Sequence, residues 1–196
     1  MRYRADITAG SLKVPESRII ADLLLRGVDQ QGWRHALYAQ NLLQTRSPRT
    51  AERLVLLLRG RLALMEADLW QLVRDGSGIV ATQACLAAAV KHSALLGDFL
   101  DLVVREQYRR YAKILSRTLW EEYIAGCRER DPEMPRWRDT TLARLRSSVL
   151  HILAQAGYID NTRTLQLHTV HLASQVTAYL TEHHEHDVLR CIQVGP

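Results

Sequence analysis

Residues 142–160, LARLRSSVLHILAQAGYID, place an amphipathic helix, a glycine and the beginning of an extended segment one after another. Apolar side chains recur every three or four residues there, which is the spacing of one buried helix face. These side chains are Leu142, Leu145, Val149, Ile152 and Leu153. Gly157 stands where a helix commonly ends, because glycine adopts the left-handed backbone of a helix C-terminus without strain. The sequence therefore predicts a helix over 140–156 that ends at Gly157.

The residues that follow Gly157 alternate in polarity and predict a short β-hairpin near 158–168. YID at 158–160 and TLQLH at 164–168 have the pattern of two strands, with turn formers between them. Asn and Asp tolerate the left-handed backbone of tight hairpin turns. A lone hairpin is only marginally stable in water, so we expect it to pack against the preceding helix. Helix, glycine and hairpin in this order are typical of the end of a winged helix-turn-helix unit, whose helix enters the DNA major groove.

Upstream of this unit the chain reads as helical. Ser47 and Pro48 begin a helix as N-cap and first helical residue, and Asp29 can cap another. Other expected helices are 15–27, a small-residue helix around 81–90, 94–115 with Leu102 and Tyr111 facing inward, 119–127 and a last one from about Ser174. DPEMP at 131–135 has two prolines in five residues and predicts a linker.

The predicted fold class is therefore mostly α. A multi-helical N-terminal bundle precedes a C-terminal winged helix-turn-helix-like unit with its short hairpin. We expect a helical domain over 1–130 and a winged-helix-like region over 131–196, which can also pack as one globule.

Composition restricts the class of protein. The 196 residues are 47% hydrophobic, enough for a buried core. The three cysteines form no CxxC pair, which favours a reducing cytoplasm. We expect no signal peptide, because the first residues lack an apolar run, and no membrane span, because the longest apolar runs fall far short of ~20 residues.

Basic residues gather in three places, and the net charge of +5 favours a polyanionic partner. One group surrounds a predicted helix start, where backbone N–H groups also attract phosphate. A second lies along the 94–115 helix and the residues after it, and a third surrounds the 140–156 helix and the hairpin tip. The candidate DNA-binding residues are Arg46, Arg49, Arg53, Arg109, Lys113, Arg136, Arg138, Arg144, Arg146 and Arg163. For each arginine alone, a solvated helix surface is the competing interpretation.

Arg61 is interpreted differently, because it falls within the apolar arc of its helix. A buried arginine needs a carboxylate partner, and Asp98 or Asp101 are the candidates. We therefore expect a structural role for Arg61.

Other chemistry is poorly supported. The pairs His168/His171 and His183/His186 have a spacing that zinc can use, but no cysteine lies close in sequence. The sequence has no GxxxxGK[ST], GxGxxG, GxSxG or HExxH motif, and its carboxylates are scattered. We expect no enzyme, no metal, no cofactor and no small-molecule substrate.

Four stretches together resemble the BrxA family of the BREX bacteriophage-defence system. They are YRADITAGSLKVPESRIIADLLL at 3–25, RLVLLLRGRLALM at 53–65, HSALLGDFLDLVV at 92–104 and the 142–160 segment. The resemblance implies a cytoplasmic, mostly α-helical protein with helix-turn-helix-like elements that binds double-stranded DNA. It implies no catalytic residues, and it implies partners among other BREX proteins, including a methyltransferase and an ATPase.

Three further hypotheses stay open at this point. The helices could dock another BREX protein as an adaptor, with the basic surface incidental. The same charge could serve RNA binding by a helical bundle. A metal-dependent enzyme is the most remote of the alternatives.

Overall fold

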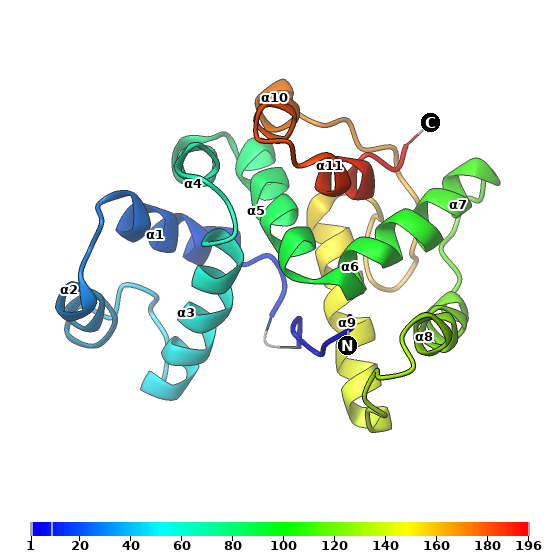
Figure 1. The fold of residues 1–196 in the computed structure, drawn as a ribbon, viewed down its shortest axis with the longest axis horizontal. Coiled ribbons are helices and arrows are strands. Elements are labelled where there is room, and N and C mark those ends of the chain that lie inside the picture. Colours follow the sequence, from blue (N-terminus) through cyan, green and yellow to red (C-terminus); the bar gives the residue numbers. More distant parts are fainter. Residues whose placement is uncertain (1, 9, 196) are drawn as a thin grey trace.

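The computed structural model describes residues 2–8 and 10–195 as a mostly helical protein (Figure 1). The α-helices are α1 (Val14–Leu25), α2 (Gln30–Arg34), α3 (Pro48–Leu62), α4 (Ala67–Asp75), α5 (Gly78–His92), α6 (Ala94–Asp98), α7 (Arg105–Arg109), α8 (Leu119–Arg130), α9 (Asp139–Ala156), α10 (Ser174–Glu182) and α11 (His186–Ile192). Two π-helical segments, η1 (His35–Ala39) and η2 (Phe99–Val104), continue α2 and join α6 to α7.

Helix starts follow the local signals in the sequence. The Ser47 side chain accepts the Thr50 N–H at 3.3 Å, and Pro48 opens α3. The Asp29 carboxylate accepts the Gly32 N–H at 2.7 Å and caps α2. Such caps satisfy N–H groups that have no partner within the helix, so these predictions are confirmed.

Helix α9 ends as the sequence predicts. Gly157 has φ +84°, and its N–H donates to the Ala154 carbonyl at 3.2 Å. The Tyr158 N–H donates to the Leu153 carbonyl at 2.9 Å. This pair of hydrogen bonds is the Schellman motif, which satisfies the last carbonyls of a helix and turns the chain sharply. Tyr158 and Leu153 are both buried, so the turn fixes the direction in which the chain leaves α9.

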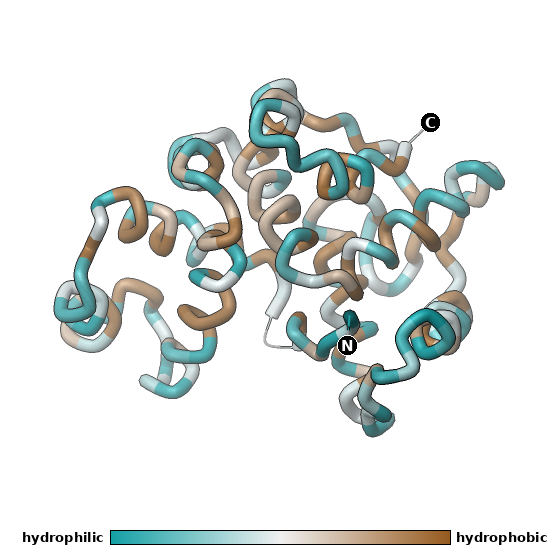
Figure 2. The backbone as a smooth tube through the Cα atoms, in the orientation of Figure 1, coloured by the Kyte–Doolittle hydropathy of each residue, from teal (hydrophilic) through white to brown (hydrophobic). Residues whose placement is uncertain are grey.

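The core is centred on α5, which packs against α1, α3, α4, α6, α9, α10 and α11. Its residues from Val80 to Val90 are buried except Thr82, and many are alanines, which let several helices approach closely. Apolar residues gather toward the middle of the molecule and hydrophilic ones at its outer turns (Figure 2). The predicted division at 130/131 stays a prediction, and helices from both sides of it pack against α5.

The segment after α9 forms a loop with little β-structure. One antiparallel bridge joins Ile159 to Leu167, and a second joins Ile114 to Gln166. Within the described residues neither the hairpin strands nor any other strand extends beyond such single bridges, so the two-stranded hairpin is not confirmed. Residues 113–115, which follow α7, also pair with this loop. The Leu115 N–H donates to the Leu165 carbonyl at 2.9 Å.

The turn of this loop differs from the one that the sequence predicts. Neither Asp160 nor Asn161 adopts a left-handed backbone; instead Leu165 has φ +56°. The Asn161 side-chain oxygen accepts the N–H groups of Arg163 and Thr164, at 2.8 and 3.1 Å. Side-chain acceptors therefore build the turn, and the left-handed residue lies after it.

The helix predicted over 94–115 ends at Arg109 and contains the π-helical segment η2. The extra residue in a π-helical turn rotates the helix faces that follow. Leu102, within this segment, is 48% exposed. Tyr111 lies beyond the end of α7 with a left-handed backbone, φ +52°, and is 89% exposed. The prediction that these two side chains face inward is wrong.

Arg61 is buried, as the sequence predicts, with 2% of its surface exposed. Its guanidinium donates to the backbone carbonyls of Ser11, at 2.8 Å, and Gly10, at 3.4 Å. The predicted partners Asp98 and Asp101 bind other side chains, so that part of the prediction is wrong. Burial lowers the pKa of Arg61 to about 10.

No single helix in the described ranges is long and apolar enough to cross a membrane. The pair Gly78–His92 and Ala94–Arg109 passes on length and composition only, and it bends by 109° at its break.

Candidate nucleic-acid interface

Helix α9 has a polar stripe along its full length. Thr140, Arg144, Ser147 and His151 recur at helical spacing and are all exposed, whereas Leu145 and Ile152 on the opposite side are fully buried. The long apolar face holds α9 against the core, so the stripe is presented to solvent on a rigid element. Side chains on such a stripe are the ones that reach base edges when a helix lies in a major groove.

The N-terminal end of α9 is basic. Arg136, Arg138 and Arg144 are exposed, and none has an ion-pair partner among the residues that the structure describes. No side chain caps the start of α9, and uncapped N–H groups together with arginines suit a phosphate. Arg146 differs, because its guanidinium pairs with the Glu121 carboxylate at 2.9 Å. Arg146 therefore joins α9 to α8 and is a weaker candidate than its neighbours.

A network of hydrogen bonds shapes the loop tip that carries Arg163. The Asp160 carboxylate accepts the Asn161 and Gln166 N–H groups, at 2.7 and 2.9 Å, and the Thr164 hydroxyl. The Thr164 hydrogen bond, followed by the two backbone N–H groups, lowers the pKa of Asp160. The Arg163 side chain is exposed on this ordered turn.

Arg117 supports the same turn from the neighbouring segment. Its guanidinium donates to the carbonyls of Thr162 and Arg163, each at 3.3 Å. Two positive charges thus lie at one loop tip. The sequence-based candidates omit Arg117, because its closeness to Arg163 depends on the pairing of residues 113–115 with 165–167, which no local pattern reveals.

Arg109 and Lys113 are exposed at the end of α7 and in the segment after it. The Lys113 carbonyl accepts the Leu167 N–H at 2.9 Å, which fixes the Lys113 backbone beside the loop. Two other basic residues of this region are held by carboxylates: Arg105 binds Asp101 and Arg110 binds Glu106. Arg109 and Lys113 are therefore the cations of this region that remain available to a ligand.

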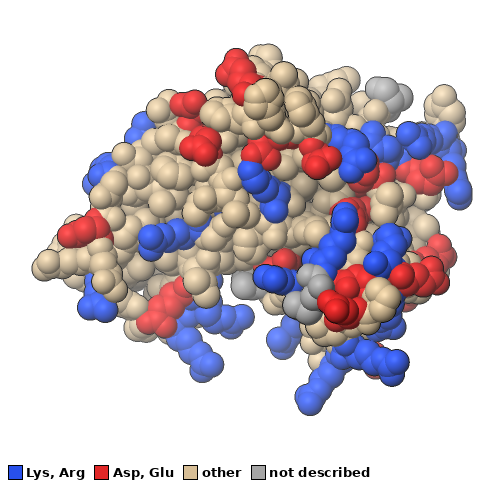
Figure 3. Space-filling model, in the orientation of Figure 1, with Lys and Arg blue, Asp and Glu red and all other residues tan. Residues whose placement is uncertain are grey.

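The basic group that the sequence places at a helix start surrounds the beginning of α3. Arg46, Arg49 and Arg53 are exposed, and no ion pair engages them within the described part of the chain. The N-terminal ends of α3 and α9 both lie at the lower edge of the molecule in Figure 1. Figure 3 shows Lys and Arg side chains projecting from that edge in two groups, one below each helix. The structure thus places these two predicted groups along one edge of the molecule.

The histidines of the C-terminal region take part in local contacts. His183 lies 3.4 Å from the Asp68 carboxylate and stacks on Tyr179. Within the described ranges, no group of three or more His, Cys, Asp or Glu residues could hold a metal ion. The expectation of a protein without metal stays a prediction.

The comparisons with known proteins agree with the resemblance in the sequence. The BrxA family profile matches residues 1–184. The chain belongs to the BrxA family. One relative, a BREX protein BrxA of Paramagnetospirillum magneticum, is 54% identical over 99% of this chain and 98% of its own length. The BREX protein BrxA of Escherichia coli O9:H4 is 31% identical over 96% of this chain and 88% of its own length.

The fold of this BrxA family member also matches a solved structure. A crystal structure of an uncharacterized protein from Magnetospirillum magneticum superposes with a TM-score of 0.92. The two chains are 51% identical, and each is covered completely. The helical arrangement described above is thus shared with an experimentally determined structure.

Proposed function

We propose that this protein is a non-enzymatic, double-stranded DNA-binding accessory component of BREX phage defence that acts in the cytoplasm. The observation that carries the proposal is the order and pairing of elements between α6 and the 157–168 loop. Residues 113–115 pair with 165–167, which pair with Ile159 in turn. A winged helix-turn-helix has a similar chain order: a helix, a first strand, two helices and a two-stranded wing whose last strand pairs with the first. In the described residues, single bridges stand in the places of these strands.

In this proposal α9 is the recognition helix and the 160–165 turn is the tip of the wing. The exposed stripe with Arg144 enters the major groove, where side chains of a recognition helix contact base edges. Arg163 and Arg117 meet phosphates or a narrow minor groove at the wing. Arg136 and Arg138 bind the backbone beside the start of α9. Arg109 and Lys113 bind phosphates beside residue 167 of the 157–168 loop, away from the 160–165 turn.

The start of α3 supplies a second contact with the same nucleic acid. It lies at the same lower edge as the start of α9, and Arg46, Arg49 and Arg53 all lie exposed there. A duplex that follows this edge would meet both helix N-termini, each of which favours negative charge. Membership in a family whose relatives are named BREX proteins supports a place in phage defence.

The test measures fluorescence anisotropy of a labelled duplex at low salt. We expect binding by the wild type and a loss of roughly tenfold or more in the Arg144→Glu and Arg163→Glu variants. Arg26→Glu, which reverses an exposed charge at the end of α1, is the matched control and retains affinity. Structured RNA serves as the competitor, and the proposal is wrong if RNA displaces the duplex easily or if no duplex binds.

An adaptor for other BREX proteins is the second candidate, and a separate surface favours it. A hollow of about 460 Å³ between η1 and α3 is lined by Leu37, Val55, Leu56 and Ala63. Leu56 is 78% exposed beside it, and exposed apolar surface of this kind often marks an interface. If Leu56→Asp abolishes co-purification of another BREX protein while duplex binding is intact, the adaptor function exists beside DNA binding.

A further inference from the structure

Several large hydrophobic side chains in the described residues are exposed, and Tyr111 is the most exposed of them. Its accessible fraction is 89%. Its backbone is left-handed, with φ +52°. A bulky residue in this conformation is strained. An exposed aromatic ring and a strained backbone both cost free energy. Residues with strained backbones cluster at functional sites.

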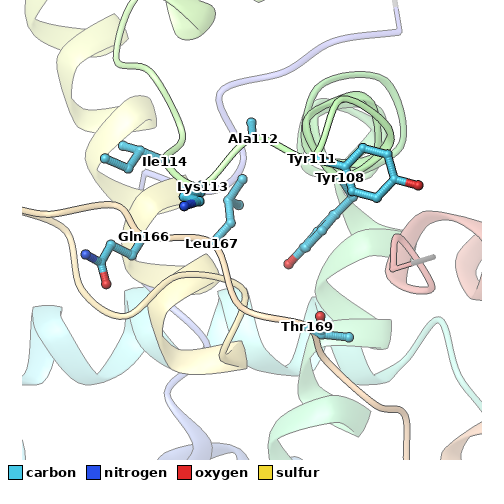
Figure 4. A pocket seen from close by; sticks show the side chains of 8 residues that line it. All are labelled: Tyr108, Tyr111, Ala112, Lys113, Ile114, Gln166, Leu167 and Thr169. Atoms are coloured by element: carbon cyan, nitrogen blue, oxygen red, sulfur yellow. The ribbon is translucent and has the colours of Figure 1, made fainter.

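Tyr111 stands between two hollows on the surface. The first, of about 470 Å³, is lined by Tyr108, Lys113, Ile114, Leu167 and Thr169 in addition to Tyr111. In Figure 4 the two tyrosines stand on one side of this hollow, and Ile114 and Gln166 lie on the other. The second, of about 330 Å³, is lined by Arg105, Tyr108, Arg109 and the residues Val194 and Gly195.

The surroundings hold the first hollow in a fixed shape. The Tyr108 hydroxyl donates to the His168 carbonyl, and burial raises the pKa of Tyr108 to about 12. Tyr108 therefore remains a neutral donor that joins α7 to the loop. The Ile114–Gln166 bridge closes the opposite wall.

Charge and shape together indicate the ligand. An aromatic face with apolar neighbours suits a flat ring, and Arg109 and Lys113 on either side of Tyr111 in sequence suit a phosphate. A nucleobase combines a flat ring with an adjacent phosphate, and tyrosine stacks on bases of any sequence. A base that is paired in a duplex cannot enter a hollow, so the ring comes from an unpaired nucleotide.

We propose that Tyr111 and the hollow beside Tyr108 bind an unpaired nucleobase at a single-stranded overhang or break in DNA. This site deepens the proposed DNA-binding function and rests on it. The wing and α9 hold the duplex, and Tyr111 stacks on the first base beyond it. The protein then prefers a duplex with an unpaired end to a fully paired one.

The experiment compares a blunt duplex with the same duplex carrying a short 3′ or 5′ thymidine overhang, by fluorescence anisotropy. Stacking of one base strengthens binding by roughly 5- to 150-fold. We expect this gain with at least one overhang in the wild type and in Tyr111→Trp, and its loss in Tyr111→Ala. Blunt-duplex affinity remains the same in all three proteins. Tyr38→Ala, at another exposed tyrosine, is the matched control and keeps the gain.

The outcomes separate this inference from the function on which it rests. If the blunt duplex binds but neither overhang adds affinity, the inference is overturned and DNA binding stands. If the gain persists in Tyr111→Ala, the base stacks elsewhere and the inference is also overturned. If no duplex binds at all, the proposed function itself fails. Tight binding of free dAMP without any overhang effect would overturn the inference in favour of a mononucleotide site.

Discussion

Gly157 is the position at which α9 turns into the proposed wing, and replacing it by alanine tests that turn. Its φ of +84° is the left-handed conformation. A Cβ atom built there meets only Val170 Cγ2, at 3.9 Å, which is an ordinary van der Waals contact. The substitution therefore causes no steric clash, and its effect comes from the backbone alone.

The expected loss follows from two opposing contributions. An L-residue with a left-handed backbone costs ~1–2 kcal/mol, and alanine recovers ~0.4–1 kcal/mol by reducing the freedom of the unfolded chain. We expect Gly157→Ala to lower the free energy of unfolding by about 1 kcal/mol. For a chain of this size that corresponds to a fall of about 2–4 °C in Tm.

Urea denaturation followed by circular dichroism measures the effect. Gly157→Asn should recover part of the loss, because asparagine visits the left-handed region more easily than alanine. Gly78→Ala is the matched control: Gly78 has no left-handed backbone and no atom within 4 Å of a built Cβ, so we expect no loss there. Equal stability of wild type, Gly157→Ala and Gly157→Asn would refute the left-handed turn at the end of α9.

Three further substitutions test other contacts in the same way. Tyr158→Phe removes the buried hydroxyl that donates to the Ile192 carbonyl at 2.6 Å; urea denaturation should show a loss of ~1–3 kcal/mol, because the carbonyl stays buried without a partner. The pKa of Asp160 is lowered in the folded protein, so the stability that its carboxylate contributes is present above its ordinary pKa and is lost as the pH falls through the folded value. Asp160→Asn should make unfolding less dependent on pH in this acidic range, and a dependence identical to wild type would contradict the assignment. Arg61→Ala removes two hydrogen bonds and leaves a cavity in the core. We therefore expect the free energy of unfolding, measured by thermal or urea denaturation, to fall by ~2–5 kcal/mol. A fall below ~0.5 kcal/mol would show that Arg61 is not buried as described.

Local signals in the sequence predict some helix ends correctly. Ser47, Asp29 and Gly157 each act within a few residues of their own position, through a hydrogen bond or a backbone conformation that one residue type favours. The mostly α fold class follows from such signals and from apolar periodicity. The predicted start of the last helical region near Ser174 is also confirmed, although no side chain caps α10.

Contacts between distant residues could not be predicted from these patterns. The partners of Arg61 are carbonyls of the N-terminal segment. Every residue type has a backbone carbonyl, so the sequence does not indicate which ones accept hydrogen bonds. The outward direction of Tyr111 goes with the end of α7 at Arg109 and with the left-handed backbone of Tyr111, φ +52°, neither of which the apolar spacing indicates. The pairing of 113–115 with 165–167 joins segments far apart in the chain, so no local pattern in the sequence predicts it.

The candidate basic residues differ in whether an acidic side chain pairs with them. All of them lie at or near the surface, as charge alone predicts, but Arg146 is occupied by Glu121. The candidates from the sequence do not include Arg117, although its guanidinium lies at the same loop tip as Arg163. Charge in a sequence identifies available cations, and only the tertiary structure shows which of them are already paired.

The central claim, that α9 and the wing bind duplex DNA through phosphates, is tested most directly by the salt dependence of binding. With six to ten phosphates neutralised, affinity should fall ~10³–10⁵-fold between 50 and 200 mM salt. Each of Arg138→Glu and Arg163→Glu should reduce the slope of log affinity against log salt by about one, because both arginines are placed on phosphates, while Arg26→Glu leaves it unchanged. A wild-type slope near zero, or identical slopes in all four proteins, would contradict the account.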